Sequence, residues 1–339
     1  MTTAGATLHR VPLEEVDWTE LASLPDRVLF QSRPWLEFLQ EAHGVTPVVA
    51  ELRREGRACG WFTGLLGQHA GLRVLGSPMP GWATQYMGFN LLPGTTRAEA
   101  VQALPAFAFG ELRCAHVEVC DRWSTGADLP GWRSTGVTTF TLDLAPSLPA
   151  ITAGLTSGTR QNLRKGERVG LQVEDAEPAG FAADYYGQLQ DVFAKQRLVP
   201  TYSQERVEQL VRHLHPTGAL QLVRVRDAEG TSVATALVLG LGRSAYFWGG
   251  ASWRQHQHLR PNEALFLHAF TTWKDRGATE FDFGGGGEYK RKYGATEVVV
   301  PHARCSRWPG VEPLRSAARA ASLTRQRLRG RRLTAASAQ

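Results

Sequence analysis

The sequence predicts a mixed α/β protein made of two domains and a basic C-terminal tail. Three observations support this fold class. The chain has 339 residues, which is more than one ordinary hydrophobic core holds. Its hydrophobic content of 42% and charged content of 21% are those of a globular protein. Segments with strand and helix periodicity alternate along the chain, and they do so twice in nearly the same order.

The second half of the chain shows the clearer pattern. Ser203 is a predicted N-cap, and one helix opens with Pro261 and ends at Gly277. The expected helices are 181–197, 203–215 and 261–277, and the expected strands are 170–175, 219–227, 231–240, 244–250, 279–283 and 296–303. Four glycines and a short basic helix lie between the last two strands.

The first half repeats this plan with weaker signals. The expected helices are 33–44 and 96–109, and the expected strands are a hairpin over 46–66 and the segments 71–76, 116–120 and 138–144. We therefore expect one domain over 1–147, a second over 148–310, and a tail over 311–339.

The order of strands and helices resembles that of GNAT acyltransferases, and two such units in tandem resemble the Fem-type peptidyltransferases. The segments that carry the resemblance are "FQSRPWLEFLQ", "TRQNLRKGERVGLQVE", "LRPNEALFLHAF", "GATEFDFGG" and "YKRKYGA". The resemblance implies two tandem GNAT-like domains with mixed sheets. It also implies an enzyme that transfers an aminoacyl group from aminoacyl-tRNA to an amine, with the acceptor on the first domain and the donor on the second.

Charge is concentrated in the tail. The net charge is +6, and the tail holds seven arginines and one acid, Glu312. Removing them from the 38 basic and 32 acidic residues leaves a body with equal numbers of each. Such a tail, whether helical or disordered, suits a phosphate-rich partner such as tRNA or an anionic membrane surface, or is simply a solvated end.

Several protein classes are excluded by what the sequence lacks. No apolar stretch approaches the roughly 20 residues that cross a bilayer, and no signal peptide is visible. The four cysteines have no disulfide or CxxC spacing. The pairs His213/His215 and His256/His258 do not have a third ligand nearby, so we expect no metal. These features predict a cytoplasmic protein without an integral membrane segment or a bound cofactor.

The loop 252–264 stands where GNAT enzymes hold the coenzyme A pyrophosphate on glycine N–H groups. It contains no glycine, and Pro261 removes one N–H. Arg254 and Arg260 are the predicted phosphate contacts of the donor. The missing glycines favour aminoacyl-tRNA over acetyl-coenzyme A as co-substrate, and Fem-type proteins likewise lack the signature.

The stretch "FDFGGGGEYKRKYGA" covers residues 281–295. In Fem-type enzymes the segment F-K-x-x-F-G lies beside the acyl group, and Lys290 matches its lysine. The resemblance implies that Lys290 and Tyr293 are catalytic, Lys290 as a cation that holds a phosphate or steadies an oxyanion. The residues assigned to donor binding are Gly285, Gly286, Tyr289 and Arg291. The alternative is a glycine turn followed by a solvated basic helix.

Four residues are assigned to the acceptor. They are Arg164 in the basic helix, Arg197 and Tyr202 in the segment that follows the first long helix of the second domain, and Trp82 in a Gly/Pro-rich loop. The stripe that contains Arg164 also suits the tRNA backbone. No lysine follows Trp35 within the next five residues, where Fem enzymes acting on a nucleotide-linked muropeptide carry one. We therefore expect a small amine or a different polymer precursor as acceptor at least as much as a nucleotide-linked muropeptide.

The sequence thus predicts an acyltransferase that forms an amide. The first alternative is an acyl-coenzyme A-dependent N- or O-acetyltransferase of the same superfamily. The second, from another class, is a non-catalytic protein that binds RNA or a membrane surface through its arginine tail.

Overall fold

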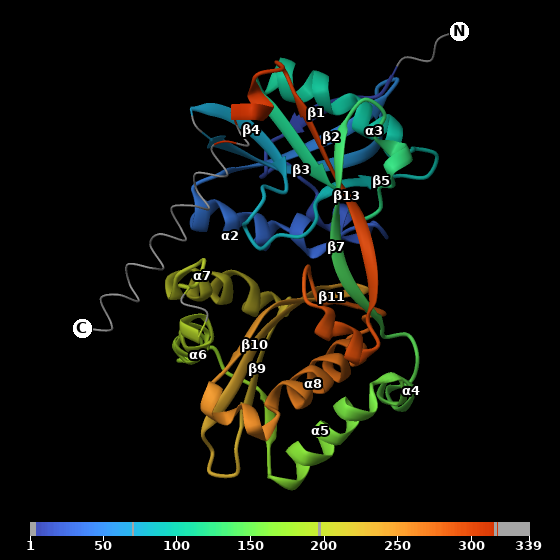
Figure 1. The fold of residues 1–339 in the computed structure, drawn as a ribbon. Coiled ribbons are helices and arrows are strands. Elements are labelled where there is room, and N and C mark those ends of the chain that lie inside the picture. Colours follow the sequence, from blue (N-terminus) through green and yellow to red (C-terminus); the bar gives the residue numbers. More distant parts are fainter. Residues whose placement is uncertain (1–4, 70, 196–197, 315–316, 318–339) are drawn as a thin grey trace, which may run out of the picture. The chain divides into compact units, whose positions relative to one another are not determined.

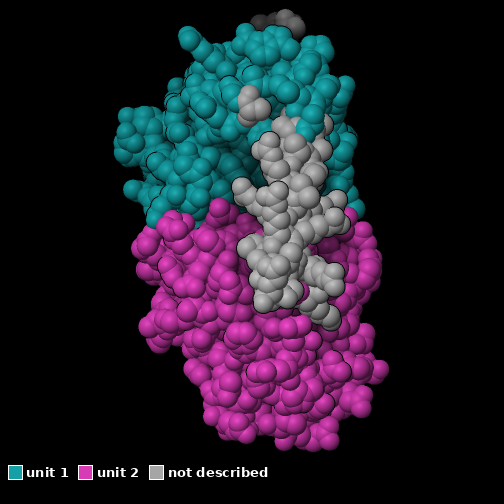
Figure 2. Space-filling model, turned by 60° about the vertical axis from the view of Figure 1, so that its left-hand side comes forward, with its two compact units in different colours: residues 1–137, 299–322 teal, residues 138–298, 323–339 magenta. Residues whose placement is uncertain are grey.

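The computed structural model describes residues 5–69, 71–195, 198–314 and 317 (Figure 1). The chain divides into two compact units (Figure 2). Unit 1 comprises residues 1–137 and 299–322, and unit 2 comprises residues 138–298 and 323–339. The seven arginines of the predicted basic tail lie outside the described residues.

Unit 1 is a sheet with the order β1-β2-β3-β4-β6-β13, in which only β4 and β6 run parallel. Its strands are β1 (Thr7–Val11), β2 (Thr46–Arg54), β3 (Arg57–His69), β4 (Leu72–Ser77), β6 (His116–Cys120) and β13 (Thr296–Ser306), with β5 (Gly88–Leu91) paired to β3. Its helices are α1 (Trp18–Ser23), α2 (Arg33–His43), α3 (Arg97–Pro105) and the short η1 (Leu29–Gln31), η2 (Ala106–Glu111) and η3 (Gly126–Asp128).

Unit 2 repeats this arrangement with the order β8-β9-β10-β11-β12-β7, and here only β11 and β12 run parallel. Its strands are β7 (Arg133–Asp143), β8 (Gln172–Asp175), β9 (Leu220–Arg226), β10 (Ser232–Leu241), β11 (Ser244–Ser252) and β12 (Glu280–Asp282). Its helices are α4 (Leu148–Gly154), α5 (Ser157–Arg168), α6 (Phe181–Lys195), α7 (Gln204–Leu214), α8 (Pro261–Asp275) and the short η4 (His215–Thr217), η5 (Arg254–Leu259) and η6 (Glu288–Tyr293).

The two units exchange their last strands. The end of β7, which closes the first half of the sequence, pairs with β12 of unit 2. The end of β13, which closes the second half, pairs with β6 of unit 1. The unit boundaries therefore fall inside these two strands rather than at the expected position after residue 147, because hydrogen-bonded pairing rather than sequence order decides which sheet a strand joins.

The core of unit 2 forms where α8 packs on the parallel strands. Phe266 and Phe270 of α8 contact Phe281 of β12, and Phe266 also contacts Phe283 and Tyr293. The apolar spacing along α8 brings these rings to one face of the helix, as its sequence predicts. The mixed α/β fold class, the Ser203 N-cap and the start of α8 at Pro261 are confirmed.

Strand β11 carries a bulge that the sequence did not reveal. Its pairing with β10 jumps from Phe247 to Gly249, which leaves Trp248 without a partner in the ladder. Phe247 packs against Phe266 on the α8 side of the sheet. A Cβ atom on Gly249 would collide with the Tyr185 hydroxyl on the α6 side. Bulges re-aim side chains next to functional sites, and this one lies beside the cavity described below.

Candidate functional site

A cavity of about 160 Å³ opens where the two parallel strands of unit 2 separate. Tyr246 and Asp282 form the last residue pair between β11 and β12. Beyond it, β11 continues through its bulge, and the chain leaving β12 turns into the four glycines. The cavity wall is apolar at Phe247, Gly250, Leu265 and Phe266, and carries polar groups at Asn262, Tyr289, Lys292 and Tyr293. The volume suits a small acyl group.

Lys292 is the cation of this cavity, and it is held in place. Its ammonium lies 2.9 Å from Oε1 of Glu263, which is buried in the first turn of α8. The ammonium also lies 4.9 Å from the centre of the Tyr293 ring. Asn162 of α5 donates a second hydrogen bond to the same carboxylate oxygen, at 3.1 Å. About a third of the Lys292 side chain (35%) stays exposed, so the cation is both fixed and accessible.

Lys290, the predicted catalytic cation, lies in a different environment. Its side chain is buried, with 3% exposed, and its ammonium donates to the carbonyl oxygens of Phe283, Gly284 and Gly285 at 2.8, 2.8 and 3.0 Å. Burial lowers the pKa of Lys290 to about 8, although Asp282 acts in the opposite direction. All three ammonium protons thus have backbone acceptors, and the cation fastens the glycine loop.

The glycine loop, residues 283–287, is also fixed from the other side. Asp282 accepts hydrogen bonds from the Thr139 hydroxyl at 2.5 Å and from the Gly284 N–H at 2.7 Å. Gly284, Gly286 and Gly287 have φ values of 74°, 72° and 85°, which side chains rarely allow. Glycine is therefore required at these positions by the path of the chain.

The remaining predicted residues of this segment have distinct positions. Tyr293 is buried against Phe266, and burial raises its pKa well above the usual value. Tyr289 lines the cavity and is 52% exposed. Arg291 pairs with two carboxylates, of Glu288 at 2.6 Å and of Glu297 at 2.5 Å.

The predicted phosphate contacts and the basic helix lie on the surface of unit 2. Arg254 is paired with Asp191 at 2.9 Å. Arg260 is exposed and takes a left-handed conformation at the N-cap of α8, with φ 64°. Arg164 is exposed on α5. It lines an open groove of about 580 Å³ together with Ser157, Gln161, Glu167 and Arg168.

The predicted acceptor residues Tyr202 and Trp82 each pack against an aromatic side chain of their own unit. Tyr202 lies on the α6 side of the sheet, where its hydroxyl is 2.5 Å from that of Tyr185 and its ring is 5.0 Å from Trp248. Burial raises the pKa of Tyr202 to about 12. Trp82 belongs to unit 1 and stacks on His43 at 4.4 Å. Arg197 lies outside the described residues.

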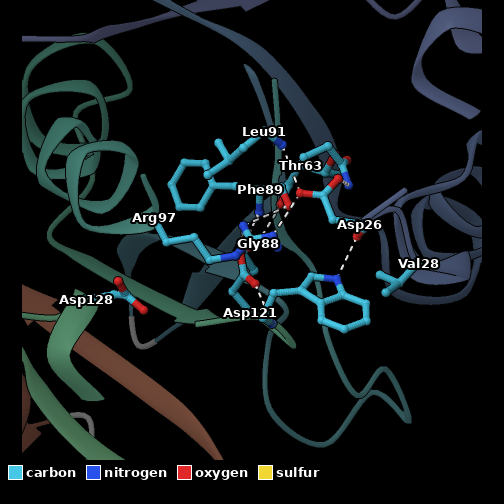
Figure 3. Close-up of polar contacts among 12 residues, drawn as sticks. Asp26, Val28, Thr63, Gly88, Phe89, Leu91, Arg97, Asp121 and Asp128 are labelled. Atoms are coloured by element: carbon cyan, nitrogen blue, oxygen red, sulfur yellow. Dashed lines mark hydrogen bonds and ion pairs between the residues drawn. The ribbon is translucent and has the colours of Figure 1, made fainter. Parts of the chain in front are cut away.

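Unit 1 fills the equivalent position with its own side chains (Figure 3). Asp121, directly after β6, accepts hydrogen bonds from the N–H of Phe89 at 2.9 Å and from Arg97 at 3.2 Å. Arg97 also pairs with Asp26 at 2.8 Å. A Cβ atom on Gly88 would lie 2.5 Å from the Asp121 carboxylate. The space between the ends of β4 and β6 is therefore occupied by protein.

The described residues contain neither a metal site nor a membrane-spanning helix. No group of three or more His, Cys, Asp or Glu side chains there could hold a metal ion. Within the same residues, no helix is long and apolar enough to cross a membrane.

Of the eight residues that line the cavity, the sequence assigned only Tyr289 and Tyr293 to the site. It assigned neither Lys292 nor Glu263, the buried partner of Lys292. Lys292 falls off the family's lysine position, and Glu263 looks like an ordinary helix residue. The signal that could have found them is the opposite charge of Glu263 and Lys292 on two segments that both border the opening between β11 and β12.

Comparisons with known proteins agree with this fold. Residues 156–292 match the family described as an acetyltransferase (GNAT) domain. FemX has 15% identity and a TM-score of 0.68, over 87% of this chain and 96% of that one. A tandem GNAT protein from the clavulanic acid biosynthesis pathway has 12% identity and a TM-score of 0.54, over 90% and 99%.

A third solved structure, L-PGS from Bacillus licheniformis, has 14% identity and a TM-score of 0.51, over 87% of this chain and 92% of that one. A comparison with curated protein sequences finds no match. The predicted resemblance to GNAT and Fem-type proteins is confirmed at the level of the fold. The chain has the tandem GNAT fold, and its residues 156–292 match the model of a GNAT acetyltransferase domain.

Proposed function

We propose that the protein transfers an aminoacyl group from aminoacyl-tRNA to an amine and so forms an amide. The observation that carries the proposal is the cavity at the ends of β11 and β12, with Lys292 fixed in its wall. The adjoining segment 253–260 forms the short helix η5 and contains no glycine for backbone contact with a pyrophosphate. This combination suits an activated ester better than a coenzyme A thioester.

The chemistry requires little covalent help from the protein. The amine nitrogen attacks the ester carbonyl carbon, and the carbonyl π electrons move to oxygen to give a tetrahedral oxyanion. Collapse of the oxyanion forms the C–N bond of the amide and breaks the C–O bond to the ribose. The proton lost by the amine ends on the released ribose hydroxyl. Positioning, exclusion of water and stabilisation of the oxyanion are what an enzyme must add.

In this proposal the cavity holds the acyl group, and the Lys292 ammonium stabilises the negative charge that develops on the oxyanion. Glu263 and the Tyr293 ring hold the Lys292 ammonium at the wall, so little reorganisation is needed when charge develops. The buried Tyr293 thus supports the cation through its ring. Lys290 remains a predicted contributor, acting through the loop that it fastens.

The RNA part of the donor would lie along α5 of unit 2. Arg164 and Arg168 are exposed on one face of this helix and line its open groove. The helix borders the cavity, because the Thr156 N–H bonds to the Lys292 carbonyl at 3.0 Å. Arginine side chains with no fixed carboxylate partner suit a phosphate backbone. The acceptor is an amine of a small molecule or of a polymer precursor.

A transfer assay with two donors tests the proposal. The protein is incubated with tRNA charged with radiolabelled amino acids, or with radiolabelled acetyl-coenzyme A, and with a mixture of amines. We expect label in products that survive mild base, which hydrolyses aminoacyl esters but not amides. Label should come from the charged tRNA and disappear when ribonuclease is added first.

Acetyl transfer from coenzyme A is the second candidate, because residues 156–292 match a GNAT acetyltransferase domain. Base-stable label from acetyl-coenzyme A alone would replace the aminoacyl proposal with this one. Calorimetry separates the two independently, since we expect weak or no binding of acetyl-coenzyme A.

A further inference from the structure

The contacts of Lys290 determine the direction of the peptide groups in the glycine loop. Its ammonium holds the carbonyl oxygens of Phe283, Gly284 and Gly285. These peptide bonds are trans, so the N–H of each peptide group points away from its carbonyl oxygen. The N–H groups of Gly284, Gly285 and Gly286 therefore point away from the ammonium. The Gly284 N–H donates a hydrogen bond to Asp282 Oδ1 at 2.7 Å.

The next two N–H groups have no such acceptor. Among the described residues, none accepts a hydrogen bond from the N–H of Gly285 or Gly286. Both glycines are exposed, and neither carries a side chain that shields its N–H. Two successive backbone N–H groups that point away from the Lys290 ammonium and have no acceptor among the described residues form a ready site for an anionic oxygen.

The loop is also fixed against the cavity at both ends. The Phe283 ring stacks on Tyr293, with ring centres 5.6 Å apart. At the other end, the Tyr289 ring lies so close to Gly287 that a Cβ atom there would come within 2.6 Å of it. Tyr289 and Tyr293 both line the cavity. The two N–H groups therefore lie on a loop that borders the proposed acyl site.

We propose that the N–H groups of Gly285 and Gly286 form an anion-binding pair that receives an oxygen of the acyl donor, and that Lys290 positions them. Lys290 then acts on the reaction without touching the substrate. The proposal deepens the proposed function and rests on it for the kind of donor. The oxygen belongs either to the tetrahedral oxyanion or to a phosphate of the donor.

A matched pair of variants tests the Gly285 N–H. A Cβ atom at this position would lie 3.0 Å from the Thr138 carbonyl oxygen, so Gly285→Ala and Gly285→Pro share that contact. Only proline removes the N–H. If the oxygen is the oxyanion, kcat should fall about 100- to 1,000-fold in Gly285→Pro relative to Gly285→Ala, at similar KM. If the oxygen is a phosphate, KM for the donor should rise while kcat is kept.

Equal kcat and equal KM in the two folded variants would overturn the proposal. Thermal unfolding of both variants checks that they fold. If acetyl-coenzyme A proves to be the donor, the proposed function fails, but the same pair still tests the N–H, because thioester aminolysis passes through the same oxyanion.

A binding measurement covers the case of a variant that does not fold. In ¹⁵N-labelled protein, titration with inorganic phosphate should shift the amide signals of Gly285 and Gly286. Lys290→Met keeps both N–H groups but removes the ammonium, and the shifts should be lost. Unmoved signals in the unaltered protein, or shifts that are equal in Lys290→Met, would contradict the role of the loop.

Discussion

The two units close the same part of their sheets in opposite ways. In unit 1, Arg97 forms ion pairs with Asp26 and Asp121, and these side chains fill the space after β4 and β6. In unit 2, the space after β11 and β12 holds a cavity, and Lys292, which pairs with Glu263, forms part of its wall. The comparison shows that one fold plan supports either a sealed or an open end. It also supports our proposal that the chemistry takes place in unit 2.

The largest effect is expected from breaking the ion pair between Arg97 and Asp121, which closes the sheet end of unit 1. Arg97→Met would leave the buried carboxylate of Asp121 without its cation, and this should destabilise the protein by about 3–5 kcal/mol. Urea unfolding measures the loss. The control is Arg54→Met, which breaks the more exposed pair with Glu99 and should lower the free energy of unfolding far less. Similar losses of unfolding free energy in the two variants would show that the Arg97–Asp121 pair contributes no more than a surface ion pair.

The next effect concerns the open end in unit 2. Lys292→Met removes the fixed cation of the cavity and should lower kcat/KM about 100- to 1,000-fold, with folding preserved. Steady-state kinetics with the donor that the transfer assay identifies measures the loss of kcat/KM. Arg226→Met serves as control, since this arginine pairs with Glu174 on the β8–β9 edge of the same unit. A loss below tenfold in Lys292→Met would mean that the cavity does not need its cation.

The third effect concerns the pH dependence of the stability that Lys290 contributes. Because burial holds the pKa of Lys290 at about 8 in the folded protein, below its ordinary 10.5, the folded state binds fewer protons than the unfolded state between these values. The contribution of Lys290 to stability should therefore rise from pH 8 to 10.5, by up to about 3 kcal/mol, and be lost as pH falls through 8.

The difference in unfolding free energy between the unaltered protein and Lys290→Met isolates this contribution. A Lys290 difference that stays flat between pH 8 and 10.5 would contradict the burial of its ammonium.

The smallest effect concerns the RNA surface. Arg164→Gln with Arg168→Gln should weaken tRNA binding and reduce the slope of log affinity against log salt by about 2. Filter binding at several salt concentrations measures both. The matched pair in unit 1, Arg10→Gln with Arg57→Gln, removes two exposed arginines and should leave the slope unchanged. Equal slopes in the two double variants would place the RNA elsewhere.

Much of the fold could be predicted from the sequence because it depends on local patterns. Periodicity identified the helix after Pro261, and turn chemistry identified the glycine stretch after β12. The exchange of β7 and β13 could not be predicted, because strand pairing between distant segments leaves no local mark. The bulge at Trp248 likewise depends on the register against β10.

The site was predicted in part. The sequence identified the segment 284–294 but not which of its cations faces the cavity. Lys290 and Lys292 are two residues apart on the short helix η6, and their environments depend on what packs around that helix. Glu263, on α8, fixes Lys292, while the carbonyl oxygens of the loop hold Lys290. These are tertiary contacts, which spacing alone does not reveal.

The exchanged strands have a consequence for synthesis on the ribosome. Unit 1 contains the whole first third of the chain, yet its sheet lacks an edge partner for β6 until Thr296–Ser306 has emerged. A nascent first half therefore waits, with β6 unpaired on one side, while more than 150 further residues are translated. Splitting the gene between the units would produce two fragments that each need the other's last strand, so co-expression rather than separate refolding should recover the protein.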